Sequence, residues 1–136
     1  MPQGELNGWT YAYSDEGSGP PIVLVHGLQM DRSMFDPVVD ALRDEYRLIT
    51  IDAPGHGESA TVPLGIDFYG FADMVAGVAD QLRIGGAVWG GQSMGGFANL
   101  RLALMHPERV TGQVVAWDDA PEVLAYHTTK TVIVRN

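Results

Sequence analysis

The chain has 136 residues, of which 17 are acidic and 8 basic, giving a formal charge of −9 at pH 7, and it contains no cysteine. This length fits one domain with a hydrophobic core, and the 46% hydrophobic share excludes a disordered chain. The acidic balance argues against nucleic acid as a partner, and the lack of cysteine excludes disulfides and thiolate zinc sites.

Alternating strands and helices predict an α/β fold, with a mostly parallel sheet, flanking helices and right-handed crossovers. Alternating aromatic and small residues predict an edge strand at Trp9–Tyr13. Apolar runs, most of them with β-branched residues, predict further strands at Ile22–His26, Tyr46–Asp52, Gly86–Gly90, Val110–Trp117 and Thr131–Val134. Apolar residues at helical spacing predict helices at Ser33–Glu45, Asp67–Arg83 and Met94–His106. The turn Ser14–Pro20 and the loop Ala53–Pro63 contain the intervening Gly, Ser and Pro residues.

The pattern G-x-S-x-G at Gly91–Gly95 is the strongest chemical signal in the sequence. It stands where a strand must turn sharply into a helix. Small residues two positions before and after Ser93 allow the chain to pass close to itself, so the serine hydroxyl is exposed at the tip. The helix that begins at Met94 directs its positive end toward the same point.

A second motif, His26-Gly27-Leu28, follows the first buried strand. A tetrahedral oxyanion needs two fixed N–H donors, and the backbone N–H groups of Leu28 and Met94 are the expected pair. We interpret His26 as a structural histidine that holds this loop by hydrogen bonds, rather than as a general base.

The segment Asp52–Ser59, with the sequence DAPGHGES, is a third motif, and its glycines allow backbone angles that other residues avoid. We interpret it as a structural turn. The alternative, in which Asp52 and His56 are catalytic partners of the serine, is less favoured.

Together these segments resemble the α/β-hydrolase superfamily, in its lipase, esterase and lactonase-like branch. The resemblance extends from about Gly19 to Asp119 and includes the H-P-E-R-V segment that begins at His106. It implies an acyl-enzyme mechanism in which Ser93 attacks a carbonyl and a histidine relays its proton. A serine at this position argues against the dehalogenase and epoxide-hydrolase branches, which use an aspartate there.

The chain departs from the family pattern after its nucleophile half. In the family the acid follows a late strand and the histidine follows the last one, in the order Ser, acid, His. The final run 129–136 resembles that late strand, so the chain is interpreted as a single minimal or truncated domain, 1–136, lacking the usual C-terminal strand and helix.

Asp118, Asp119 and His127 could replace the missing groups, because Ser93, Asp118 or Asp119, and His127 reproduce the family's order. In the alternative, Asp118 caps a loop and His127 is a solvated residue. His106 ends a helix, and its charge suits the helix dipole there.

A parallel sheet that ends early leaves an open edge and uncovered apolar faces. We therefore expect a homodimer or larger homo-oligomer, in which His127 of one copy could serve Ser93 of another. The absence of a long apolar run and of a signal peptide predicts no membrane partner and a cytoplasmic location.

The leading functional hypothesis is a serine hydrolase for small-molecule carboxylic esters or lactones, with apolar walls from Leu28, Met30, Met94 and Trp117. One alternative is a catalytically impaired or non-enzymatic domain that associates with a partner. Another is a cofactor-free haloperoxidase-like activity on the same triad. No cofactor, metal or phosphate-binding loop is expected.

Overall fold

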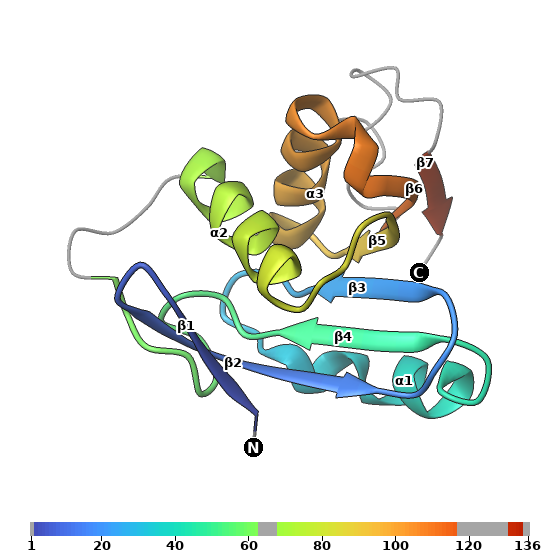
Figure 1. Cartoon of the computed structure of the whole chain (residues 1–136), viewed down its shortest axis with the longest axis horizontal. Helices are drawn as coiled ribbons and strands as arrows, with labels where there is room; N and C mark the ends of the chain where they lie inside the picture. The colour runs from blue at the N-terminus through green and yellow to red at the C-terminus, as the bar shows by residue number, and fades with distance from the viewer. Residues whose placement is uncertain (1, 63–67, 117–130, 135–136) are drawn as a thin grey trace.

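The computed structural model describes residues 2–62, 68–116 and 131–134, which form a single sheet flanked by helices (Figure 1). Within these residues the sheet has seven strands in the order β1-β2-β4-β3-β5-β6-β7. β1 and β2 pair antiparallel, β2 pairs antiparallel with β4, and the remaining pairs are parallel. The strands are β1 Gln3–Leu6, β2 Trp9–Glu16, β3 Pro21–Val25, β4 Arg47–Ile51, β5 Ala87–Gly91, β6 Val110–Ala116 and β7 Thr131–Val134.

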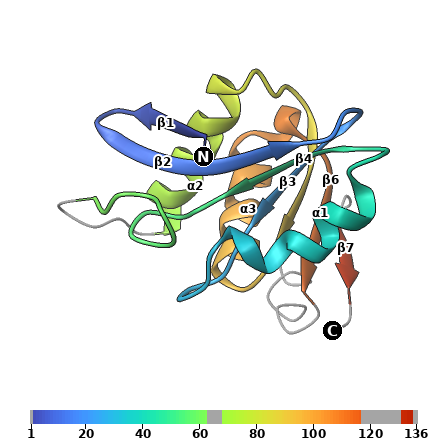
Figure 2. The same ribbon diagram turned by 90° about the horizontal axis from the view of Figure 1, so that it is seen from below.

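Helices cover both faces of this sheet, as the view in Figure 2 makes clear, with α1 on one face and α2 and α3 on the other. Their bounds are α1 Asp36–Leu42, α2 Phe68–Gln81 and α3 Met94–Met105, with short 3₁₀ turns η1 Arg32–Phe35 and η2 Pro107–Arg109. The predicted α/β architecture with a mostly parallel sheet is therefore confirmed. No helix in the described ranges is long and apolar enough to cross a membrane.

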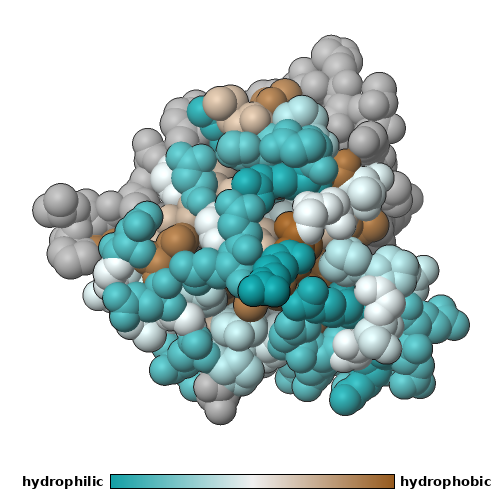
Figure 3. Space-filling view, viewed as in Figure 1, coloured by the Kyte–Doolittle hydropathy of each residue, from teal (hydrophilic) through white to brown (hydrophobic). Residues whose placement is uncertain are grey.

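The two faces of the sheet have separate apolar cores. Val23 and Val25 belong to the larger core with residues of α2 and α3, while Leu24 belongs to the smaller core beneath α1. This alternation along β3 is what a strand buried on both faces requires. The face seen in Figure 3 is largely hydrophilic, with apolar atoms limited to small patches.

Three predicted elements differ from the structure. The helix expected over Ser33–Glu45 is divided into η1 and a shorter α1, because Pro37 favours a new helix start and the chain turns after Leu42. The turn expected from Ser14 begins later, since β2 continues to Glu16 and pairs there with β4. The strand expected at the edge, Trp9–Tyr13, lies inside the sheet as part of β2, because β1, which no pattern in the sequence predicts, pairs with its outer side.

The strand order changes direction between β3 and β5. From β3 the chain crosses to β4 on one side, whereas from β5 it crosses to β6 on the other side, although β3 and β5 are neighbours. In open α/β sheets the crevice at the carboxyl ends of two such strands is where ligands bind. The candidate site is therefore expected just after Val25 and Gly91.

Candidate active site

Ser93 occupies the tip of the turn between β5 and α3, in a backbone conformation that ordinary residues rarely adopt. Its φ is 50° and its ψ is −113°, and it directly precedes the first residue of α3. A positive φ at a non-glycine residue carries a cost of about 1–3 kcal/mol, which persists only where surrounding structure enforces it. The half-buried serine is therefore held in a strained position at the positive end of a twelve-residue helix.

The flanking glycines are what allow this turn. A Cβ added to Gly91 would lie 2.6 Å from the backbone carbon of Gly95, and one added to Gly95 would lie 2.0 Å from the carbonyl oxygen of Val25. Neither contact is tolerable for real atoms. The expectation that small residues at these two positions let the chain pass close to itself is confirmed.

The loop after β3 lies directly against this turn. Val25 and Gly91 are register partners at the ends of the two strands, and the N–H of Gln92 donates to the carbonyl of Val25 at 3.2 Å. A Cβ on Gly27 would lie 2.1 Å from Oε1 of Gln92. The segments carrying Leu28 and Ser93 are thus in van der Waals contact.

Leu28 and Met94 present backbone N–H groups on the two sides of this contact. In the part of the chain that the structure describes, neither N–H donates a hydrogen bond to a protein acceptor. Leu28 is 65% exposed and Met30 is 41% exposed. Among the described residues, these segments therefore carry two backbone N–H groups without a protein acceptor and two exposed apolar side chains.

His26 is fully buried and holds the loop rather than facing the serine turn. Its Nδ1 lies 2.7 Å from the carbonyl oxygen of Gly27, and its Nε2 accepts from the N–H of Ala53 at 2.9 Å. An amide N–H can only donate, so the ring is neutral with its proton on Nδ1. Burial, with a smaller contribution from nearby His56, holds the pKa of His26 below its ordinary value. The structural interpretation of His26 is confirmed.

The carboxylate of Asp52 is buried and used within its own turn. It accepts from the N–H of Arg32 at 2.8 Å and the N–H of Glu58 at 2.9 Å, and it pairs with the Arg32 guanidinium. His56 accepts from the N–H of Gln29 at 3.1 Å through Nε2, and its Nδ1 lies 2.9 Å from the carbonyl oxygen of Pro54. These contacts support a structural turn over a catalytic pairing of Asp52 with His56.

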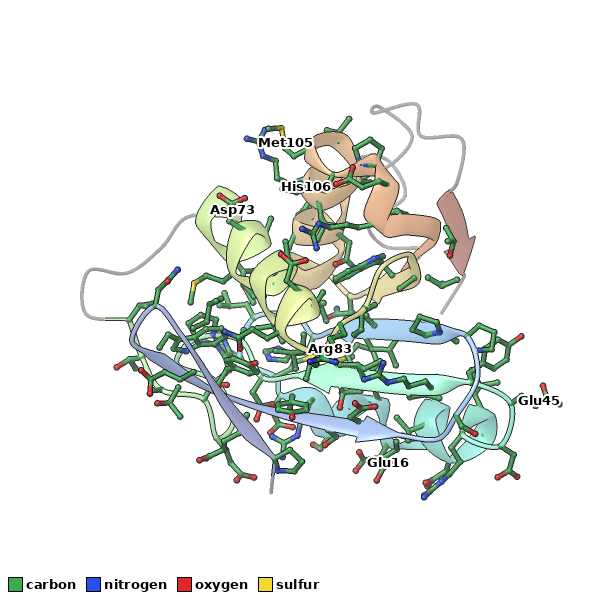
Figure 4. The ribbon with its side chains drawn as sticks, viewed as in Figure 1. Glu16, Glu45, Asp73, Arg83, Met105 and His106 are labelled. Carbon is green, nitrogen blue, oxygen red and sulfur yellow. The ribbon has the colours of Figure 1, made fainter. Side chains whose placement is uncertain are left out.

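The remaining histidine of the described segments lies far from the serine. His106 caps the end of α3 opposite Ser93, near the labelled Met105 in Figure 4, and its Nδ1 lies 3.7 Å from Oε1 of Glu108. Twelve helical residues separate the two ends by about 18 Å at 1.5 Å per residue. His106 is therefore too far away to be the base.

The other expected site residues, Asp118, Asp119, His127 and the wall residue Trp117, lie outside the described residues. Residues 2–62, 68–116 and 131–134 contain no group of three or more His, Asp or Glu side chains that could hold a metal ion.

Comparison with known proteins identifies the family. A family model described as alpha/beta hydrolase fold matches residues 20–116. The chain belongs to this family. It is 34% identical over 113 residues to a pimeloyl-[acyl-carrier protein] methyl ester esterase from Aliivibrio salmonicida, covering 83% of this chain and 41% of that protein.

Solved structures of the alpha/beta hydrolase fold agree with this assignment. An enol-lactonase from Burkholderia xenovorans superposes with a TM-score of 0.79 at 32% identity, covering 85% of this chain and 46% of that one. A thermophilic esterase from Thermogutta terrifontis gives 0.77 at 34% identity, covering 84% and 43%. The chain thus spans about two-fifths of the length of the curated relatives and solved structures that it matches.

Three residues around the site were not anticipated from the sequence, namely Gln29, Arg32 and Gln92. Arg32 is the partner of Asp52. The signal for this pair in the sequence is the acidic residue directly after a buried strand, because a carboxylate buried there needs a cationic partner. Gln29 has a φ of 63°, which nothing in its residue type predicts. Gln92 fills the space beside Gly27.

The close approach at Gly95 gives a direct stability test. Gly95→Ala should lower the free energy of unfolding by at least about 2 kcal/mol, since the new methyl group would meet a backbone carbonyl that cannot move aside. Urea denaturation measures the change. Gly85→Ala is the matched control, because a Cβ there has nothing within 4 Å, and it should change stability by less than about 1 kcal/mol. Equal losses in the two variants would contradict the packing argument.

The lowered pKa of His26 predicts a pH dependence of stability. The unfolded chain binds a proton at this histidine near pH 6.5 while the folded chain does not, so the unfolding free energy falls as pH drops below that value. The titratable side chains that act on the pKa of His26 are His56, Asp52 and Asp31.

Urea denaturation at pH 7.5 and pH 5.0 compares wild type with His26→Asn, whose amide can still donate to Gly27. The variant should be less stable at pH 7.5, by about 1–3 kcal/mol from the lost acceptor for Ala53, yet lose less stability on acidification. The same loss on acidification in both proteins would show that His26 is not the titrating group.

Proposed function

We propose that this chain carries the nucleophile half of a serine hydrolase acting on small carboxylic esters or lactones. The observation that supports this most directly is the strained conformation of Ser93 beside the available N–H groups of Leu28 and Met94. In this proposal the Ser93 turn is the nucleophile elbow of the hydrolase fold, and the two N–H groups form its oxyanion hole.

The chemistry follows from this placement. The Ser93 oxygen attacks the substrate carbonyl carbon, its proton passes to a base, and the carbonyl π electrons move to oxygen. The two N–H donors and the N-terminus of α3 stabilise that developing negative charge. Collapse of the tetrahedral species breaks the bond to the alcohol oxygen, which takes the proton from the base, so that the alcohol leaves or the lactone ring opens and an acyl group remains on Ser93. Water then attacks the acyl-enzyme, releasing the acid and restoring the serine.

Two observations support the substrate class, namely the exposed apolar side chains of the Leu28 loop and the names of the matched proteins. Exposed Leu28 and Met30 offer apolar contact for an acyl or alcohol group. The matched proteins named as a methyl ester esterase and an enol-lactonase both act, by their names, on carboxylic ester bonds. A neutral ester with a short acyl chain is therefore the proposed small-molecule substrate.

The proposed base is His127, oriented by Asp118 or Asp119. Among the described histidines, His26 and His56 are occupied by backbone groups and His106 lies at the far end of α3. The base is provided either within one copy or by the second copy of a homodimer.

Ser93→Ala should lower the rate of p-nitrophenyl acetate hydrolysis at least about 100-fold, because it removes the attacking atom. Initial rates by absorbance, together with covalent labelling by a fluorophosphonate, measure the effect. Ser33→Ala is a matched serine control outside the turn. Hydrolysis and labelling that persist in Ser93→Ala would refute the enzyme proposal and favour a non-enzymatic domain.

A mixing experiment separates the two arrangements of the base. Ser93→Ala and His127→Ala should each be inactive. If the second copy provides His127, mixing and re-associating the two variants should restore about a quarter of wild-type activity, because half the dimers are mixed and each has one intact site. If the triad lies within one copy, the mixture should stay inactive. Full activity of His127→Ala alone would contradict both arrangements.

A further inference from the structure

Two peptide units meet at Leu28, and each is held by a different histidine. In the first unit, the carbonyl oxygen of Gly27 lies 2.7 Å from Nδ1 of His26 and also accepts from the N–H of Met30 at 3.2 Å. These two donors occupy both lone pairs of that oxygen. A trans peptide is planar, with its N–H opposite its C=O, so fixing this carbonyl also fixes the direction of the Leu28 N–H.

The second unit joins Leu28 to Gln29. The N–H of Gln29 donates to Nε2 of His56 at 3.1 Å, and Nδ1 of His56 lies 2.9 Å from the carbonyl oxygen of Pro54. An amide can only donate, so Nε2 must be unprotonated and Nδ1 must carry the proton. His56 is thus attached to its own turn through one ring nitrogen and to the Leu28 loop through the other.

These hydrogen bonds act where side-chain packing does not hold the loop. The Leu28 side chain is 65% exposed, so its packing provides no anchor. Gln29 has a φ of 63°, which carries a cost of about 1–2 kcal/mol for an L residue. The hydrogen bond to His56 offsets that cost by stabilising the peptide orientation that the left-handed residue produces.

We propose that His56 is a positioning residue for the oxyanion donor, acting with His26 to hold the two peptide units on either side of Leu28. This inference rests on the proposed function, because the role of Leu28 belongs to it. His56 contacts no substrate in this arrangement. It acts through Gln29, and its loss leaves the peptide units around Leu28 held from one side only, so that the Leu28 N–H is positioned less firmly toward the developing oxyanion.

Amide hydrogen exchange followed by NMR tests the holding contact without any need for activity. In His56→Ala the exchange rate of the Gln29 amide should rise at least about tenfold, because its acceptor is gone. In His56→Gln a side-chain oxygen can replace Nε2, so exchange should stay within about threefold of wild type. His106→Ala, a histidine at the far end of α3, is the matched control and should leave this amide unchanged.

Steady-state hydrolysis of p-nitrophenyl acetate by the same 136-residue variants tests the positioning role. His56→Ala should lower kcat about tenfold with KM within about twofold, as expected when an interaction made only in the transition state is weakened. His56→Gln should recover most of that loss, and His106→Ala should match wild type.

The outcomes separate the two proposals. Unchanged exchange at Gln29 in His56→Ala overturns the inference, as does a rise in KM without a fall in kcat. Faster exchange with unchanged kcat, in a protein where Ser93 is essential, also overturns it. If Ser93→Ala is as active as wild type, the proposed function fails, and the exchange data alone decide whether His56 holds the loop.

Discussion

The contact between the start of α3 and the carboxyl end of β3 is the constraint on which the site depends. Gly95 lies so close to the carbonyl of Val25 that no side chain fits between them. This approach fixes where α3 begins, which in turn forces Ser93 into its positive φ. It also sets the register in which the loop after β3 meets the turn after β5. A single close approach of backbone to backbone thus places the candidate nucleophile, the helix N-terminus and the Leu28 loop at one point.

Contacts from the turn after β4 hold the Leu28 loop in place. Asp52 receives the N–H groups of Arg32 and Glu58 in addition to the Arg32 guanidinium, which also donates to Ser14 on β2 at 3.0 Å. For a buried ion pair the loss of hydration offsets much of the Coulomb attraction, so the value of this pair lies in the geometry it fixes. It connects the end of β4 to the segment that follows the Leu28 loop. His26 and His56 complete the connection, so the turn after β4 acts as the support of the loop after β3.

Much of the fold and part of the site could be predicted from the sequence, because both depend on local signals. The continuous apolar run from Ile22 to Val25 identifies a strand buried on both faces, and the glycines around Ser93 identify the turn. The strand β1 could not be predicted, because it forms only by pairing with β2. The same reason applies to the hydrogen-bond partners of His26 and His56, although the structural role of His26 was predicted. The sequence shows that a histidine stands at a given position in a motif. Its tautomer depends on which backbone groups the folded chain brings to its two ring nitrogens.

The two chemical tasks of the proposed site, oxyanion stabilisation and proton transfer, depend on different kinds of group, the first on the backbone and the second on a side chain. In the proposed mechanism, stabilisation of an oxyanion uses N–H groups and a helix end, which the local chain path fixes once β3, β5 and α3 are in register. Proton transfer instead needs a side chain with a suitable pKa at hydrogen-bond distance from Ser93, and His26, His56 and His106 are each committed elsewhere. The electrostatic part of a hydrolase site can therefore be encoded in one contiguous half of the fold. The proton-transfer part requires a side chain from another segment, because the three described histidines make their contacts elsewhere.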